Sequence, residues 1–384
     1  IKGFYIHSAS LRGVAQSGSA SGLGPEGRKF ESCRPDQKNM STPSESLFYM
    51  PPEWHPHECC WMQWPTESFP TNATPSWSHF DLDKGRIAWA NVANSISKFE
   101  KLLMIVNPSD LKSATKLLNS NIEILELPIN DAWCRDSGAI FLLNEKNQLG
   151  GVDSDFNCWG YKENFELDDK VAKFMINHSN SKYFKNNMVL EGGSIHVNGK
   201  GTLITTEQCL LNKNRNPNLS KDQIESNLKN YFGIENIIWL KHGTDEGTDG
   251  HIDNVACFSN SDTILTMTCN DQSDSYYDLL SENLDILKTS KDQNGKPFNI
   301  IELEMSNKRI IPDDDEPSSY INFYIANDAI IFPIFGDKEA DENAEKVIKS
   351  QFPNRQIVCL DGRDILLGGG NIHCITQQQP RSVK

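Results

Sequence analysis

The sequence lacks any uninterrupted apolar run of the roughly 18–20 residues that a membrane-spanning helix needs. It also lacks a Cys-x-x-Cys pair, and its ten cysteines show no Cys and His spacing typical of structural zinc. Acidic residues outnumber basic ones, 52 Asp and Glu against 37 Lys and Arg, which gives a net charge of −15. These features argue against a membrane protein, a zinc-stabilised domain and a nucleic-acid-binding protein, and the charge favours a cationic ligand.

The cysteines of this 384-residue chain are scattered, and the adjacent residues Cys59 and Cys60 are poorly placed to bridge each other. In a chain of this length we interpret them as reduced thiols, which predicts a cytoplasmic location. Nothing in the sequence calls for a metal or an organic cofactor. The oligomeric state stays open, and a homo-oligomer is compatible with the sequence.

Residues 1–39 differ from the rest of the chain, because they are rich in Gly and Ser and carry six basic against three acidic residues. The stretch 13–36 is similar to the peptide produced when a bacterial tRNA gene is translated as protein, and Met40 follows it closely. We therefore expect a non-native or disordered extension over residues 1–39 and a single globular domain over residues 40–384.

Strand-like and helix-like stretches alternate along this domain, which predicts an α/β architecture. The strand-like runs are 102–106, 122–127, 139–143, 202–206, 263–267 and 329–333. The helix-like stretches are 84–99, 110–118, 168–176, 220–231, 276–287 and 339–351. Ser220 and Gln223 have the spacing of a capping box that opens one of these helices.

Four segments place glycine beside ionisable side chains, each next to a strand-like run: 133–138, 191–196, 248–254 and 368–376. Glycine lets the backbone approach a ligand closely. From these segments we take one thiol, one histidine and three carboxylates as candidates, namely Cys374, His251, Asp136, Glu191 and Asp253. This set is typical of a Cys/His nucleophilic site that acts on a cationic substrate.

Each of these residues also has an ordinary structural interpretation. A cysteine such as Cys374, which we expect just after a short strand, is most often buried and inert. His251 alone would be interpreted as a core or helix-capping histidine, and Asp136 as the ion-pair partner of Arg135. If His251 and Asp253 lie on one strand, two residues apart, their side chains point to the same face.

The sequence contains a short internal repeat: Gly192–Val197 (GGSIHV) matches Gly369–Cys374 (GGNIHC), with Val197 at the position of the cysteine. Similar units occur near Asp136 and Gly250. Repeated supersecondary units predict a quasi-symmetric fold with its ligand at the axis. The alternative is that Gly-Gly turns recur by chance.

Taken together, these motifs resemble the agmatine deiminase family of the guanidino-group modifying superfamily. The resemblance extends from about residue 49 to 380 and rests on 50–54, 61–65, 131–136, 191–196, 211–217, 250–254, 319–324 and 368–378. It implies a five-bladed α/β propeller of ββαβ units with the active site on the pseudo-fivefold axis. It also implies hydrolysis of agmatine to N-carbamoylputrescine and ammonia, in polyamine (putrescine) biosynthesis or in arginine and agmatine catabolism.

The resemblance implies a role for each candidate residue. Cys374 is the nucleophile that forms a covalent amidino-cysteine, and His251 is the general acid and then the general base. Asp136 and Asp253 hold the guanidinium group. Glu191 orients His251 or contacts the guanidinium.

Three further residues are expected to bind substrate. Trp133 packs along the methylene chain, with an ordinary core tryptophan as the alternative, and Gly369 and Gly370 allow close backbone approach. A deiminase of peptidyl-arginine or of free arginine would use the same chemistry. A non-catalytic guanidinium- or polyamine-binding protein is the alternative from another class.

Overall fold

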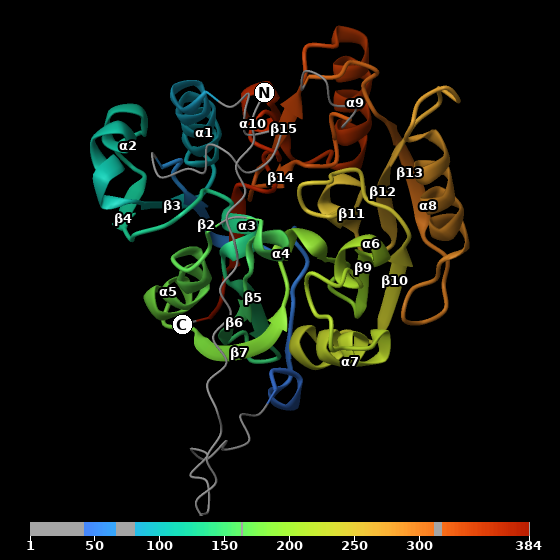
Figure 1. Ribbon diagram of the computed structural model, residues 1–384, viewed down its shortest axis with the longest axis horizontal. Helices are drawn as coiled ribbons and strands as arrows, with labels where there is room; N and C mark the ends of the chain where they lie inside the picture. The colour runs from blue at the N-terminus through green and yellow to red at the C-terminus, as the bar shows by residue number, and fades with distance from the viewer. Residues whose placement is uncertain (1–41, 67–80, 163, 311–316, 384) are drawn as a thin grey trace, which may run out of the picture. The chain divides into compact units, whose positions relative to one another are not determined.

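Five small β-sheets with helices on their outer sides make up the part of the chain that the computed structural model describes (Figure 1). The described residues are 42–66, 81–162, 164–310 and 317–383, so the predicted extension over residues 1–39 lies outside them. Residues Ser41–Lys384 form one unit, distinct from Ile1–Met40.

Neighbouring strands within each sheet are not always consecutive in sequence. In spatial order, the first sheet is β1 (Phe48–Tyr49), β5 (Ile140–Asn144), β6 (Leu149–Asp155) and β7 (Lys182–Val189), and the second is β10 (Asn236–Leu240), β9 (Thr202–Thr206) and β8 (His196–Val197). The third is β11 (Ala256–Asn260), β12 (Thr263–Thr268) and β13 (Asn299–Glu304), and the fourth is β14 (Tyr324–Ile325), β15 (Ala329–Ile334) and β16 (Gln356–Asp361). The fifth is β17 (Thr376–Pro380), β2 (His57–Gln63), β3 (Lys101–Val106) and β4 (Glu123–Glu126).

One strand pattern recurs in all five sheets: an antiparallel pair whose second strand pairs in parallel with the strand after a helix. It occurs in β5-β6-β7, β8-β9-β10, β11-β12-β13, β14-β15-β16 and β17-β2-β3. A parallel partner needs a crossover, which a helix supplies. In the fifth sheet the C-terminal β17 pairs with the N-terminal β2, so the two ends of the described unit meet in one sheet.

The helices connect the parallel strands or open the segments between sheets. The longer helices are α1 (Leu82–Ile96), α2 (Leu111–Leu117), α5 (Val171–His178), α7 (Lys221–Phe232), α8 (Tyr277–Thr289) and α9 (Lys338–Gln351). The four-residue helices are α3 (Cys134–Ser137), α4 (Cys158–Tyr161), α6 (Glu207–Leu210) and α10 (Arg363–Leu366). The 3-10 turns are η1 (Ser44–Ser46), η3 (Pro108–Asp110), η4 (Asp168–Lys170), η5 (Gly192–Ser194) and η6 (Ile252–Asn254).

The α/β class is confirmed. The six predicted strands and the six predicted helices are also present, with ends that shift by up to three residues. The capping box is present, because Gln223 N donates to Ser220 Oγ and Ser220 N donates to Gln223 Oε1. That helix, α7, ends at Gly233, whose φ of 66° suits glycine. Within the described ranges, every helix is too short or too polar to cross a membrane.

Candidate active site

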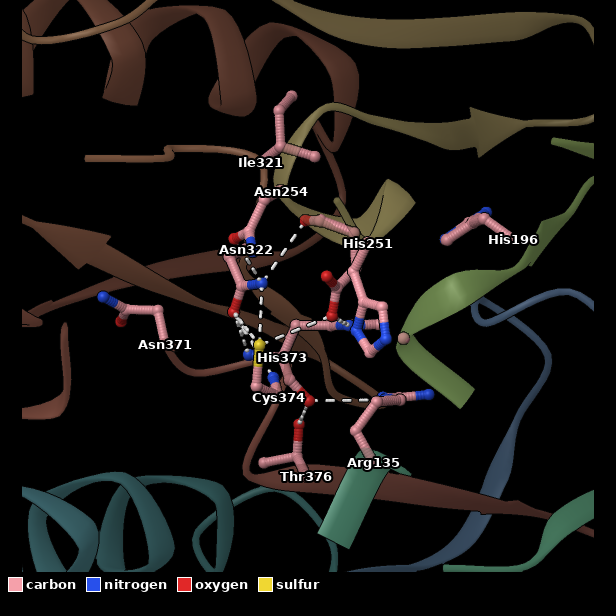
Figure 2. Close-up of polar contacts among 12 residues, drawn as sticks. Arg135, His196, His251, Asn254, Ile321, Asn322, Asn371, His373, Cys374 and Thr376 are labelled. Carbon is pink, nitrogen blue, oxygen red and sulfur yellow. Dashed lines mark hydrogen bonds and ion pairs between the residues drawn. The ribbon is translucent and has the colours of Figure 1, made fainter. Parts of the chain in front are cut away.

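The candidate residues lie in the short segments that lead into the first strand of each repeated unit. Asp136 lies in α3 ahead of β5, and Glu191 comes directly before η5, ahead of β8. His251 and Asp253 lie at η6 ahead of β11, and Cys374 lies ahead of β17. The topology therefore brings one or two functional side chains from each of four units to one place. Figure 2 shows His251, Cys374 and their neighbours gathered there.

Gly193 marks the point where three of these side chains converge. A Cβ on Gly193 would lie 2.6 Å from His251 Nδ1, 2.8 Å from Asp136 Oδ1 and 3.0 Å from Asp253 Oδ2. The first two distances are shorter than real Cβ atoms show, and the third is very tight. One histidine and two carboxylates therefore pack directly against Gly193, in an arrangement that a side chain at this position would disturb.

Cys374 is buried beside this point. Its Sγ lies 3.5 Å from Asp253 Oδ2 and 3.1 Å from the side-chain nitrogen of Asn322 (Figure 2). Burial, together with the negative charges of Asp253 and Asp136, raises the pKa of the thiol well above its usual value. These influences favour the protonated thiol at neutral pH.

His251 lies between two carboxylates and is fully buried. Its Nδ1 is 3.7 Å from Asp136 Oδ1, and its Nε2 is 4.0 Å from Glu191 Oε2. Burial alone would lower the pKa of His251, but Asp136, Cys209 and Glu191 outweigh that effect and raise the pKa to about 10. The histidine is therefore a cation at neutral pH and has a proton to give.

Asp136 is oriented by two donors. Trp159 Nε1 donates to Oδ2 at 2.9 Å, and the backbone N–H of Gly193 donates to Oδ1 at 3.0 Å. Burial raises the pKa of Asp136 to about 6, against the lowering effect of His251. Asp136 is therefore a carboxylate at neutral pH, and its Oδ1 lies beside Gly193.

Asp253 belongs to a buried network of charges. His373 bridges two acids, with Nδ1 2.9 Å from Asp253 Oδ2 and Nε2 2.8 Å from Glu53 Oε1. Burial alone would raise the pKa of Glu53, but His373, His196 and Arg135 hold it well below its usual range. In the same way, His373 holds the pKa of Asp253 below normal despite burial. The network keeps Asp253 ionised and fixes its orientation.

Glu191 is held from the opposite side by Arg215. Arg215 Nε lies 2.6 Å from Glu191 Oε1, and both side chains are fully buried. The other oxygen of Glu191 points to His251. Arg215 also donates to the backbone oxygen of Thr248 at 2.7 Å. One guanidinium therefore ties Glu191 to the loop that leads to His251.

Trp133 and Cys374 both lie against Gly370. A Cβ on Gly370 would lie 2.7 Å from the Trp133 ring and 3.1 Å from Cys374 Sγ. Gly369 has a φ of 98°, which strongly favours glycine. Trp133 is buried and packs edge-on against Trp89 with ring centroids 5.6 Å apart. The ring therefore contacts the core on one side and approaches the cysteine on the other.

Two local expectations from the sequence are wrong, and one alternative interpretation finds no support. His251 and Asp253 do not lie on a strand, because the backbone forms the 3-10 turn η6 before β11 begins at Ala256. Cys374 lies in a turn that precedes a strand, β17, instead of following one. The alternative interpretation paired Asp136 with Arg135. Arg135 instead contacts Glu53 at 3.3 Å and the backbone oxygen of His373, so it belongs to the buried network.

In the described part of the chain, Glu191, Cys209 and His251 are the group whose metal-ligating atoms all lie within 4.8 Å of one another. One thiol, one imidazole and one carboxylate form a donor set that suits zinc. Glu191 already balances Arg215, and His251 faces the candidate active site. An ion bound there would therefore compete with the proton chemistry of His251.

Sequence reasoning missed several residues that contact the site. Trp159 orients Asp136, Glu53 anchors His373, and Asn322 contacts Cys374. Glu53 and Asn322 do lie in stretches that carried the family resemblance, 50–54 and 319–324. That membership was the only available signal, because neither stretch contains glycine.

Comparison with known proteins identifies the family of this chain. The family described as Porphyromonas-type peptidyl-arginine deiminase matches residues 49–380. The chain belongs to this family. The resemblance to agmatine deiminases is also confirmed at the level of individual relatives.

Two relatives and one solved structure illustrate the similarity. A Legionella pneumophila protein, provisionally named agmatine deiminase, is 45% identical over 350 residues that cover 90% of this chain and 99% of the relative. Agmatine deiminase of Medicago truncatula is 38% identical over 374 residues, covering 88% of this chain and 98% of the relative. The structure of agmatine deiminase of Enterococcus faecalis matches with a TM-score of 0.82 and 34% identity, over 89% of this chain and 98% of that one.

Proposed function

We propose that this member of the family hydrolyses agmatine to N-carbamoylputrescine and ammonia through a covalent amidino-cysteine. The observation that carries the proposal is the convergence of a histidine and two carboxylates on Gly193, with the Cys374 thiol beside one of those carboxylates, Asp253. The names of the relatives support agmatine as the substrate.

The guanidinium group of the substrate would bind between the carboxylates of Asp136 and Asp253. A planar guanidinium presents parallel N–H groups that match a carboxylate in a two-bond fork. Asp253 Oδ1 is buried and has no hydrogen-bond partner among the described residues, so it is free to accept such a bond. The bound cation would face Cys374, whose sulfur lies beside Asp253.

Substrate binding would also activate the nucleophile. The two carboxylates that disfavour the Cys374 thiolate in the empty site would be neutralised by the incoming cation. The pKa of the thiol then falls, and a thiolate forms next to the electrophilic carbon. The thiol proton is released to solvent as the cation binds, and the sulfur electron pair forms the C–S bond.

His251 would complete both halves of the reaction. As a cation it donates a proton to the departing nitrogen, which leaves as ammonia while the C–N bond breaks. The neutral imidazole then takes a proton from water, whose oxygen attacks the amidino carbon. The C–S bond breaks, its electron pair returns to Cys374, the proton of the new C–OH group passes to the sulfur, and the product carries a neutral ureido group. Glu191 would hold the imidazole in position throughout.

The aminobutyl part of agmatine would extend past Trp133. The Trp133 ring lies beside Gly370 and Cys374, so methylene groups could pack on it. Gly369 and Gly370 would let the backbone pass close to the substrate. No metal or organic cofactor enters these steps.

We extend the proposal to the architecture and setting. The five recurring strand units and the closure of β17 onto β2 support a five-bladed propeller with the site on its pseudo-fivefold axis. Residues 40–384 would then be the catalytic domain, without a contribution from residues 1–39. We place the enzyme in the cytoplasm, in polyamine biosynthesis or agmatine catabolism, with assembly into a homo-oligomer left to experiment.

The test is ammonia release from agmatine, free arginine and a blocked arginyl peptide, with Cys374→Ser as control. We expect turnover of agmatine alone, and loss of turnover in the Cys374→Ser variant. Preferential turnover of an arginine substrate would overturn the specificity. Absence of turnover with all three would support a guanidinium- or polyamine-binding protein.

A further inference from the structure

We propose that Asn322 is a further catalytic residue, whose side-chain amide donates a hydrogen bond to Cys374 Sγ and stabilises the thiolate. This inference rests on the proposed function, since it assigns a task within that reaction. It starts from an imbalance in the site. Asp253 and Asp136 both oppose a negative charge on the sulfur, so a hydrogen-bond donor to the sulfur would add to the effect of the bound substrate cation while the thiolate forms.

The repeated strand pattern places Asn322 where the other units place their functional residues. Segments ahead of β5, β8, β11 and β17 carry Asp136, Glu191, His251 with Asp253, and Cys374. The segment ahead of β14 is the corresponding one in the remaining unit, and Asn322 lies two residues before that strand. Asn322 is fully buried. The fold thus delivers one side chain of this unit to the same centre.

The orientation of the Asn322 amide follows from its partners. Its Oδ1 accepts the backbone N–H of His373 at 2.9 Å and that of Cys374 at 3.3 Å. Both partners are donors, so this atom must be the oxygen. The nitrogen donates to Asn254 Oδ1 at 2.9 Å, and its second N–H group has Cys374 Sγ at 3.1 Å and the backbone oxygen of Asp253 at 3.3 Å as acceptors (Figure 2). The amide N–H therefore points at the reacting atom.

This amide can serve both protonation states of the cysteine. As a thiol, Cys374 can donate its proton to Asn322 Oδ1 or to Asp253 Oδ2, each at 3.5 Å. As a thiolate it can only accept, and the Asn322 nitrogen is the side-chain donor that contacts it. The groups that face the sulfur are then Asp253, Asp136, this amide and the backbone N–H of Asn371. A fixed dipole in a buried site stabilises charge without reorganising.

The test measures alkylation of Cys374 by iodoacetamide against pH, followed by mass spectrometry of the Cys374 peptide. Asn322→Asp keeps an oxygen for the two backbone N–H groups but loses the amide donor, whereas Asn322→Ala removes the donor without adding charge. Loss of one charge-assisted hydrogen bond predicts a rise of about one to two pH units in the midpoint of alkylation. With agmatine, kcat should fall about 10- to 100-fold near neutral pH, recover towards alkaline pH, and leave KM little changed.

Asn371→Asp is the matched control. Asn371 is also buried and lies three residues from Cys374, but its side chain bonds Gly362 and the backbone of Ile372. We expect a much smaller shift in this variant. An unchanged alkylation midpoint in folded Asn322 variants, or an equal shift in Asn371→Asp, would overturn the proposal. Alkylation needs no agmatine, so the result stands even if agmatine proves not to be the substrate.

Discussion

Substitution of Gly193 by alanine is the most direct perturbation of the candidate site. The new Cβ would lie 2.6 Å from His251 Nδ1, whereas an ordinary contact begins at 3.4 Å. His251 would have to retreat by about 0.8 Å, and Asp136 and Asp253 would have to give way by smaller amounts. Misplacement of about 1 Å in a catalytic group can cost about 100-fold in rate. We therefore expect kcat/KM for agmatine to fall about 100-fold in Gly193→Ala.

The same substitution should affect folding much less than activity. Overpacking of one methyl group costs about 1–3 kcal/mol of unfolding free energy, which lowers the unfolding temperature by a few degrees. Gly295→Ala is the control, because its φ is 78° but no atom lies within 4 Å of the added Cβ. Backbone strain there costs stability without touching the site. If Gly193→Ala kept its kcat/KM within about threefold of the parent, the convergence on Gly193 would not be where the reaction occurs.

Three other predictions use the charges of the site. We expect kcat/KM to fall below about pH 6, as Asp136 gains a proton, and above about pH 10, as His251 loses one; a profile without the acidic limb would contradict the role of Asp136. Trp159→Phe removes the indole donor to Asp136, so the acidic limb should move up by about one pH unit, and an unmoved limb would show that this bond does not tune the carboxyl. Arg215→Gln leaves the charge of Glu191 buried without its partner, and urea unfolding should show a loss of about 3–5 kcal/mol; a loss below about 1 kcal/mol would mean that Glu191 is stabilised otherwise.

The elements that the sequence predicted are those with strong side-chain patterns. β3 and β15 are apolar runs buried along nearly their whole length, and α9 buries Asp341, Ala344 and Ile348 on one face. Some of the missed strands carry weaker signals. β8 and β14 have two residues each, and the interior residues of β16 are only half-buried. Short strands are specified by their partners in the sheet, which a local pattern does not contain.

The candidate site shows the same division between local and long-range signals. Cys374, His251 and Asp136 were found because each lies near a glycine in a segment that recurs along the chain. Asn322 was missed because its segment lacks glycine, although it leads into the first strand of its unit like the others. Glu53 was missed as a partner of His373 because 320 positions separate them in sequence. Only the closure of β17 onto β2 brings these ends together.

The carboxylates around Cys374 explain how a buried thiol can be both inert and reactive. In the empty site they hold the sulfur in its protonated form, so the cysteine is protected from unspecific electrophiles. A bound guanidinium cancels their effect on the sulfur, and the electrophile itself triggers formation of the thiolate. The ureido product is neutral and cannot cancel the effect of the carboxylates on the sulfur. This disfavours attack of Cys374 on the product and aids product release. In the proposed reaction, selectivity for a cation and activation of the nucleophile therefore arise from the same two residues, Asp136 and Asp253.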